Sequence, residues 1–311
     1  MSGFLDRMAT GSRERAAATL AARPLADLRR QCRDLPPPVA PARAGGFDLI
    51  AELKLRSPAL GDLGQADDDL AARVTGYARA GAAAVSVLTE PTRFAGSLEH
   101  LRAAAAALAP LGVPAMRKDF LVDPCQLYEA RLAGAGGALL IVRMLSRGAL
   151  GEMLDCAREL GLFVLVEAFD EQDIVVAAEV LAAGGQGGRR PPERASLARG
   201  AERSRASAAG DPGDEGRPAG DEIARDDVLL GVNSRDLQTL EVVPGRLEQL
   251  APLLPCDRAR VAESGLTTAA DAARMARAGY DMALVGGALM AAADPGGLVR
   301  AMLEAGREAA A

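Results

Sequence analysis

Eight strand-like apolar runs alternate with helical stretches along this chain, and this alternation constrains its fold more than any other feature. The runs cover residues 46–54, 83–89, 115–120, 139–144, 163–169, 228–237, 259–265 and 282–289. Strands that alternate with helices predict a parallel sheet, and eight such units predict a closed (β/α)8 TIM barrel in the α/β class. A length of 311 residues suits one barrel with insertions, and 49% hydrophobic residues supply its core.

Charged residues at the end of the first run indicate a candidate site. Glu52 and Lys54 both point the same way, because successive side chains of a strand alternate between its two sides. Burying an unpaired charge is costly, so charges on a buried strand are typical of a functional site. For this run alone, solvated charges on a frayed strand are an equal alternative. Repetition of the pattern on other strands favours the site.

Polar residues also end the later runs. Lys118 ends the third run, Glu167 the fifth, Asn233 and Arg235 the sixth, and Glu263 and Ser264 the seventh. The C-terminal ends of all the strands of a barrel meet at one face, which carries the active site. Arg143, in the fourth run, either lines this mouth or pairs with a neighbouring carboxylate.

The loops that follow the strands add candidate binding residues. Ser57 follows the first run, and Phe94, which follows the second, serves either packing or ligand contact. Gly265 is the last residue of the seventh run, and Gly286 and Gly287 lie in the eighth. Glycines let backbone N–H groups approach an anion closely, so these positions predict a phosphate site.

The chain has two regions outside the regular alternation. Residues 1–45 predict two helices packed outside the barrel, over its bottom or wall, and residues 46–311 form the barrel. Residues 184–226, between the fifth helix and the sixth strand, contain few bulky aliphatic residues, and we expect a disordered insertion. A connection from a helix to the next strand lies on the N-terminal face, opposite the site.

Composition excludes several function classes. A net charge of −6 gives no electrostatic reason to expect nucleic acid. Four separated cysteines and one histidine form no zinc cluster, and we interpret the cysteines as reduced thiols. Without an apolar signal core or a run of about 20 apolar residues, we expect a cytoplasmic protein that does not enter a membrane.

Several motifs, in this order and spacing, carry a resemblance to a known family. They are AELKLRSP (51–58), LTEPTRFAGS (88–97), MRKDF (116–120), LVEAF (165–169), GVNSRDLQTLEV (231–242), VAESGL (261–266) and LVGGALM (284–290). From about residue 47 to 292, apart from the insertion, the chain resembles the indole-3-glycerol phosphate synthases of tryptophan biosynthesis. Its opening helices resemble the N-terminal extension of that family.

The resemblance implies a lyase that acts on a small phosphorylated substrate, 1-(2-carboxyphenylamino)-1-deoxyribulose 5-phosphate. The enzyme closes a pyrrole ring on this substrate with loss of carbon dioxide and water. No cofactor and no metal are implied, and we expect a monomer or a weak homodimer.

The resemblance also implies roles for the matched residues. Lys118 would be the general acid toward the ketone, and Lys54 would contact anionic groups or supply a proton in dehydration. Glu167 would stabilise a cationic intermediate or take a proton, with Glu52 and Glu263 orienting the lysines. The remaining matches would position the substrate (Asn233, Ser57, Arg235), hold its phosphate (Ser264, Gly265, Gly286, Gly287) and lie against it (Phe94). The order of the proton transfers stays open.

Three positions depart from the family pattern. Phe169 stands where a histidine is common, Gly287 where a serine or glutamate is common, and Leu55 where a basic residue is frequent. We expect altered packing around Phe169 and the loss of one side-chain contact to phosphate at Gly287. Each matched catalytic residue is retained.

Two other functions are alternatives for this sequence. Phosphoribosylanthranilate isomerase, another phosphate-binding barrel, uses a cysteine at the end of its first strand, where this chain has Glu52 and Lys54. A silent paralogue that binds a sugar phosphate, or a partner through the insertion, is the alternative from a different class. Retention of costly buried charges argues against it.

Overall fold

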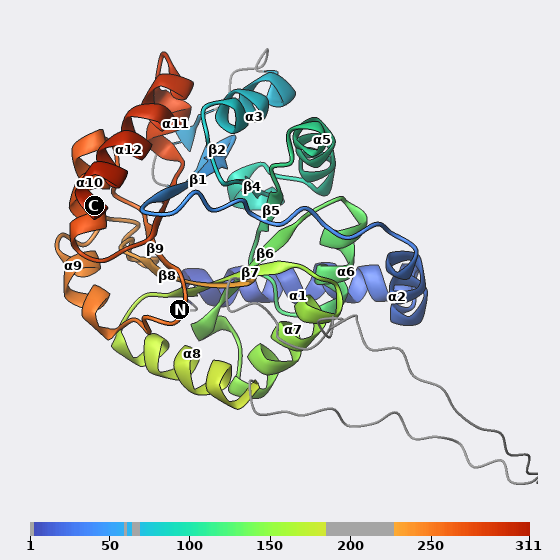
Figure 1. The fold of residues 1–311 in the computed structure, drawn as a ribbon. Helices are drawn as coiled ribbons and strands as arrows, with labels where there is room; N and C mark the ends of the chain where they lie inside the picture. The colour runs from blue at the N-terminus through green and yellow to red at the C-terminus, as the bar shows by residue number, and fades with distance from the viewer. Residues whose placement is uncertain (1–2, 59–60, 64–68, 185–226) are drawn as a thin grey trace, which may run out of the picture.

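A computed structural model describes residues 3–58, 61–63, 69–184 and 227–311, and it contains the predicted (β/α)8 barrel. Figure 1 shows the ring of strands with helices around its outside. All neighbouring barrel strands pair in parallel, and the first pairs with both the second and the last, which closes the ring. The barrel strands are β1 (Asp48–Leu53), β4 (Ala84–Leu88), β5 (Ala115–Lys118), β6 (Gly137–Ile141), β7 (Phe163–Ala168), β8 (Val228–Asn233), β9 (Arg260–Glu263) and β10 (Met282–Val285).

Helices form the outer layer. The longer ones are α3 (Leu70–Arg79), α5 (Leu98–Leu108), α6 (Pro124–Leu132), α7 (Arg147–Glu159), α8 (Glu171–Gly184), α10 (Ala269–Arg277) and α12 (Pro295–Ala310). Shorter elements are α4 (Pro91–Phe94), α9 (Arg246–Leu250), α11 (Gly287–Ala291), η1 (Ala109–Leu111), η2 (Val142–Met144), η4 (Ala251–Leu253) and the hairpin of β2 (Arg56–Ser57) and β3 (Gly61–Asp62). Polar side chains begin several helices; Asp123 and Thr268, for example, form capping boxes on α6 and α10.

Each barrel strand presents alternate side chains to two separate cores. On β7, Val164 and Val166 belong to the core between strands and helices, whereas Phe163 and Leu165 belong to the core inside the ring. Because side chains alternate along a strand, Glu167 lies on the inner side with Phe163 and Leu165. The same rule places Lys118 on the inner side of β5 after Met116, which belongs to the inner core.

Every barrel strand ends before the corresponding apolar run does, and at two strands the difference changes an interpretation. β6 ends at Ile141, so Arg143 lies in η2 and not on a strand; its guanidinium pairs with Asp173 and Asp170 at 2.6 and 2.7 Å. Of the two interpretations of Arg143, pairing with carboxylates is therefore confirmed. β10 ends at Val285, and the short helix α11, which periodicity did not reveal, begins at Gly287.

The N-terminal segment contains two helices, α1 (Phe4–Ala22) and α2 (Leu25–Arg33). α2 packs against α6 on the barrel wall, and α1 packs against α6 and η2. Figure 1 shows α1 crossing one end of the ring of strands, faded with distance. The first turn of α1 reaches the mouth, because Phe4 lines the cavity there. α2 thus lies on the wall, whereas α1 also reaches the mouth, which was not expected from the sequence.

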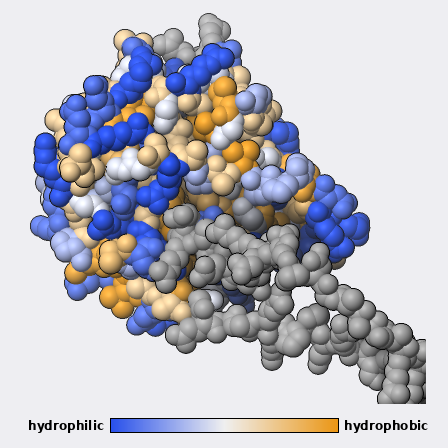
Figure 2. Space-filling view, in the orientation of Figure 1, coloured by the Kyte–Doolittle hydropathy of each residue, from blue (hydrophilic) through white to orange (hydrophobic). Residues whose placement is uncertain are grey.

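The expected insertion falls outside the described residues, except for its first residue, Gly184, which ends α8. In the described part of the chain no helix is long and apolar enough to cross a membrane. Figure 2 shows hydrophilic residues over much of the visible face, with apolar residues in small groups between them.

Candidate active site

A cavity of about 450 Å³ opens at the C-terminal ends of the barrel strands. All the site residues predicted from the sequence lie around it: Glu52, Lys54, Ser57, Phe94, Lys118, Glu167, Asn233, Arg235, Glu263, Ser264, Gly265, Gly286 and Gly287. They come from the ends of β1, β5, β7, β8 and β9 and from the loops after the barrel strands. The barrel topology thus gathers side chains that are more than 200 positions apart in the sequence, such as Glu52 and Glu263.

Four charged residues form the inner layer beneath this cavity. Glu52, Lys118, Glu167 and Glu263 come from β1, β5, β7 and β9, which are alternate strands of the ring. Alternate strands of a (β/α)8 barrel contribute the side chains of one interior layer, usually branched aliphatic ones. Here that layer is charged, and its carboxylates are almost fully buried.

Lys118 is the centre of the layer. Its Nζ donates to Glu167 Oε2 at 3.2 Å and to Glu263 Oε2 at 3.1 Å. Burial opposes the charged form, but Glu167, Glu263 and Glu52 together raise the pKa of Lys118 above its usual range. The lysine is therefore an ammonium, with a proton to donate.

Glu263 has two oxygens in different surroundings. Oε2 accepts from Lys118, whereas Oε1 is buried with no hydrogen-bond partner among the described residues. A Cβ atom at Gly231 would lie 2.3 Å from Oε1, so this oxygen packs directly against the backbone of β8. Burial raises the pKa of Glu263 to about 8, with Glu167 adding to the rise and Lys118 opposing it.

Lys54 and Glu52 form a second pair, with Nζ donating to Oε1 at 2.8 Å. Burial would raise the pKa of Glu52, but Lys54 and Lys118 outweigh burial and lower it, so the carboxylate stays charged. A Cβ at Gly286 would lie 2.3 Å from Glu52 Oε1. Glycine at this position therefore leaves the space that Glu52 occupies.

Asn233 orients the third carboxylate and the loop after β8. Its Nδ2 donates to Glu167 Oε1 at 2.8 Å, and its Oδ1 accepts from the backbone N–H of Arg235 at 2.9 Å. Arg235 in turn donates to the carbonyl of Leu240 at 2.6 Å, and burial lowers the pKa of its guanidinium. The loop consequently turns back over the cavity, where Leu237, Leu240 and Val242 line it.

Backbone donors lie in the turn after β9. Ser264 and Gly265 have φ values of +69° and +76°, so two consecutive residues adopt the left-handed conformation. Ser264 is not a glycine, and Ser234 holds this turn: its Oγ donates to the carbonyl oxygen of Ser264 at 3.1 Å. Successive peptide N–H groups in such turns form concave sites that suit an anion. Gly286 and Gly287 line the same cavity.

An aromatic wall completes the site, and the sequence indicated only one of its members. Phe94 and Phe120 have ring centroids 6.0 Å apart, and Phe4 and Phe120 lie edge to face at 5.8 Å. Phe120 lies two residues after Lys118 in the MRKDF motif, and this motif could have indicated it. Nothing in the sequence indicated that Phe4 belongs to the site, because helical periodicity does not show where a helix docks.

Phe169, which stands where a histidine is common in the family pattern, packs against Arg143. Its ring is buried beneath the guanidinium of Arg143, 4.6 Å from the ring centroid, and its backbone N–H donates to Asp173 at 2.9 Å. This cation–π contact joins η2 to the start of α8 outside the main cavity.

No group of three or more His, Cys, Asp or Glu side chains that could hold a metal ion occurs within the described ranges. Three glutamates of the cavity are instead paired with lysines: Lys54 binds Glu52, and Lys118 binds Glu167 and Glu263. The described cysteines are all free thiols.

Comparison with known proteins gives a consistent result. The family model for indole-3-glycerol phosphate synthase matches residues 5–184 and 222–302. An indole-3-glycerol phosphate synthase from Nocardioides sp. is 41% identical over 301 residues, covering 96% of this chain and 97% of the relative. One from Mycobacterium leprae is 36% identical over 305 residues, covering 97% and 94%. Among solved structures, a thiamine phosphate pyrophosphorylase from Pyrococcus furiosus matches with a TM-score of 0.52 at 12% identity, covering 85% of this chain and 98% of that chain, which shows the fold alone.

Proposed function

The chain belongs to the indole-3-glycerol phosphate synthase family, and from its site we propose which side chains carry out the reaction. The enzyme is a carboxy-lyase of tryptophan biosynthesis. It converts 1-(2-carboxyphenylamino)-1-deoxyribulose 5-phosphate to indole-3-glycerol phosphate, with loss of carbon dioxide and water. Family membership sets aside the isomerase alternative.

One observation carries the assignment of the proton donors. Lys54 and Lys118 are the only lysines in the sequence, and all the others among its 36 lysine and arginine residues are arginines. Both lysines line the cavity. Arginine supplies charge and hydrogen bonds but does not give up a proton, whereas a lysine ammonium does. Both lysines of the chain thus lie at the cavity, where each can supply a proton.

Lys118 acts as the general acid of ring closure. Attack of the benzene ring on the ketone carbon places negative charge on the ketone oxygen, and a nearby ammonium stabilises and protonates that oxygen. The carboxylate of Glu167 holds Lys118 in its charged form, and the contacts with Glu167 and Glu263 direct the ammonium across the cavity. As the ketone oxygen gains charge in the transition state, it competes with these carboxylates for the proton.

Glu167 and Lys54 act in the later steps. Ring closure gives an iminium cation, which the buried carboxylate of Glu167 stabilises and which loses carbon dioxide to restore the benzene ring. After the hydroxyl has left as water, Glu167 takes the carbon-bound proton whose loss makes the pyrrole ring aromatic. Asn233 fixes Glu167, and Glu52 fixes Lys54, which protonates the departing hydroxyl. The phosphate binds to the backbone N–H groups of Ser264, Gly265, Gly286 and Gly287.

We further propose a cytoplasmic enzyme that works as a monomer or a weak homodimer. Free thiols at the described cysteines fit a reducing compartment. The large exposed hydrophobic residues, Leu25, Leu111, Val175, Val242 and Leu253, belong to different elements, whereas an obligate interface gathers such residues into one patch. The net charge of −6 argues against nucleic acid as a binding partner.

Turnover of the substrate, followed by indole fluorescence, tests the function with wild type and Lys118→Ala. We expect wild-type turnover and a loss of kcat by orders of magnitude in the variant, with substrate binding kept. Circular dichroism and unfolding curves control for the fold of the variant. A folded wild-type chain that binds the substrate without producing the indole would identify a silent paralogue.

A further inference from the structure

The aromatic wall is built from three segments that are distant in the sequence. Phe4 lies on α1, Phe94 on α4 and Phe120 just after β5. Aromatic pairs at these separations contribute little beyond area burial, which is too little to fix three backbone segments. Other contacts must therefore set the relative positions of the rings.

Two buried carboxylates hold the backbone beside two of the rings. Asp119 Oδ1 accepts from the N–H of Phe120 at 2.8 Å. Glu90 Oε2 accepts from the N–H groups of Arg93 and Phe94 at 2.7 and 3.3 Å. Both acids are at most 2% exposed, so their charges need a compensating cation.

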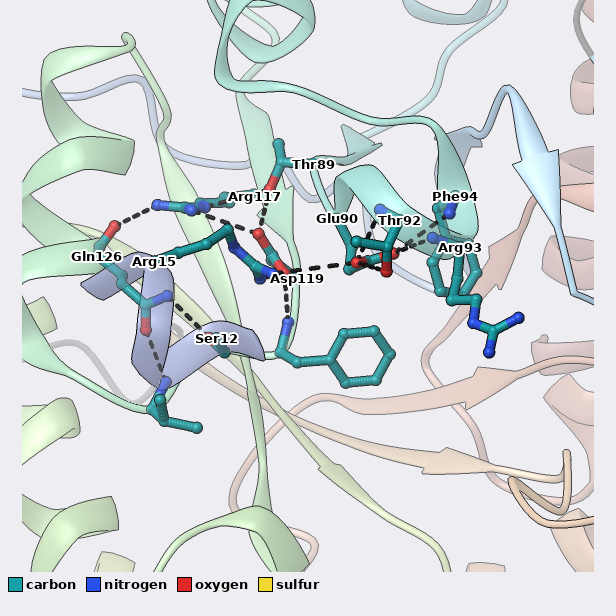
Figure 3. A network of polar contacts seen from close by, with 12 residues as sticks. Ser12, Arg15, Thr89, Glu90, Thr92, Arg93, Phe94, Arg117, Asp119 and Gln126 are labelled. Atoms are coloured by element: carbon teal, nitrogen blue, oxygen red, sulfur yellow. Dashed lines mark hydrogen bonds and ion pairs between the residues drawn. The ribbon is translucent and has the colours of Figure 1, made fainter. Parts of the chain in front are cut away.

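One guanidinium joins these two carboxylates to the helix that carries the third ring. Arg15, on α1 with Phe4, contacts Asp119 Oδ1 at 2.9 Å through NH2 and Glu90 Oε1 at 4.0 Å through NH1. Figure 3 shows the Arg15 side chain reaching between the two acids, with Thr89 and Arg117 on the other side of Asp119. Thr89 and Arg117 donate to Oδ2, at 2.8 and 3.3 Å, so Oδ1 is left to Arg15 and to Phe120.

Other contacts dock α1 independently of Arg15. Gln126 Nε2 donates to Ser12 Oγ at 2.9 Å, and Thr19 Oγ1 donates to Glu129 Oε1 at 2.7 Å. Ser12 and Ala16 are buried. Arg15 is 30% exposed in its side chain and is not needed to bury this face of the helix. Its two-carboxylate contact is therefore not the sole anchor of α1, and it reaches the two acids that hold the backbone beside the rings.

We propose that Arg15 is a positioning residue for the reaction, which acts through Asp119 and Glu90 to set the three-ring wall. The inference rests on the proposed function, in which the ketone faces Lys118, and it adds that the benzene ring of the substrate lies against this wall. Ring closure requires the attacking aromatic carbon to meet the ketone carbon in one orientation. Displacement by a fraction of an ångström lowers the rate of such a step.

Steady-state kinetics of Arg15→Met test this role. We expect kcat/KM to fall about twentyfold, through a rise in KM and a fall in kcat, because the wall is used both in binding and in alignment. Arg15→Lys keeps the charge, but its single ammonium lacks the fork of donors that reaches both acids, so it restores only part of the activity. Arg13→Met, an exposed position on the same helix, is the matched control and retains wild-type kinetics.

Two further variants separate positioning from a loss of stability. Thr19→Val removes an α1 anchor without touching a ring, so it lowers Tm and leaves kcat/KM unchanged. Phe120→Leu removes the central ring. If Arg15 acts through the wall, Arg15→Met in that background lowers kcat/KM by less than about threefold, a non-additive result.

The inference is overturned if Arg15→Met retains wild-type kinetics, if Thr19→Val lowers kcat/KM equally, or if the effects of Arg15→Met and Phe120→Leu multiply. These outcomes concern the variants alone. Absence of turnover in the wild-type chain would instead reject the proposed function.

Discussion

The ammonium of Lys118 lies 3.1 Å from Oε2 of Glu263, while the other oxygen of that carboxylate is buried against β8 without a hydrogen-bond donor among the described residues. The contact of Oε2 with Lys118 thus favours the ionised form of Glu263, whereas burial of Oε1 disfavours it. Burial prevails and raises the pKa of Glu263 to about 8. A proton is therefore held on this acid at pH values where an exposed glutamate has lost it.

This held proton predicts a pH dependence of stability. A carboxyl whose pKa is higher in the folded state than in the unfolded state stabilises the fold below its unfolded pKa, and that stability is lost as pH rises toward the folded pKa. The window here runs from about 4.5, the ordinary value, to about 8. We expect the contribution of Glu263 to fall by on the order of 1 kcal/mol per pH unit across it.

Urea unfolding at pH 5, 6, 7 and 8 measures this contribution in wild type and Glu263→Gln. The variant keeps the size of the side chain and removes the titration, so its free energy of unfolding should vary less with pH than that of wild type. Equal slopes for the two proteins would contradict the assignment.

Gly231 allows Glu263 to reach Lys118, which predicts a large effect of Gly231→Ala. The added Cβ would lie 2.3 Å from Glu263 Oε1 and 3.0 Å from Leu165 Cδ1, so the carboxylate must move. We expect a loss of about 1–3 kcal/mol in stability from overpacking and a fall in kcat of about tenfold or more.

Gly151→Ala is the matched control for this substitution. Gly151 lies in α7, and a Cβ added there would meet nothing within 4 Å, so alanine should add about 0.5–1 kcal/mol to stability through helix propensity. Its kcat should stay at the wild-type value. Thermal unfolding and steady-state kinetics compare the two variants, and a Gly231→Ala enzyme with normal kcat would show that Glu263 need not hold its position.

The presence of only two lysines predicts an unusually clean chemical modification. Acetylation removes the charge and the transferable proton of a lysine. The side-chain amines of this chain are those of Lys54 and Lys118, while the arginines that form the outer ion pairs stay unmodified. We expect activity to fall in step with acetylation of the lysines, measured by peptide mass spectrometry. Bound indole-3-glycerol phosphate should slow the acetylation and the loss of activity alike. Full activity after both lysines are acetylated would remove them from the chemistry.

The period of the strands made much of this site predictable. Glu52, Lys118, Glu167 and Glu263 lie inside the ring because a two-residue repeat determines the side on which each side chain lies. The repeat also placed Arg143 on a strand, and this was wrong because β6 ends at Ile141 and a 3-10 turn follows. A short apolar run does not show where its strand stops.

Contacts made by α1 could not be derived from the sequence. The helical repeat predicts that Met8, Ser12 and Ala16 share a face but does not identify the surface that this face meets. Arg117 and Asp119 flank Lys118 and contact Thr89, Glu129 and Arg15 from elsewhere in the fold. A pattern of local charges contains no information about such distant partners.

Replacing each lysine by arginine separates charge from proton transfer. Lys118→Arg keeps a cation between Glu167 and Glu263 but removes the group that protonates the ketone oxygen. We expect kcat to fall by roughly 10³-fold or more while KM changes by less than about tenfold, since general acid catalysis typically contributes 10²–10⁴-fold.

Lys54→Arg should behave differently if Lys54 acts only after ring closure. Decarboxylation and ring closure would then proceed, and an intermediate that still carries its hydroxyl would accumulate before dehydration. Single-turnover experiments with rapid quench and mass spectrometry distinguish the intermediate from the product by the mass of one water. Accumulation of that species in Lys54→Arg but not in Lys118→Arg would order the two lysines along the reaction. If both variants instead accumulate unreacted substrate, Lys54 acts in ring closure together with Lys118.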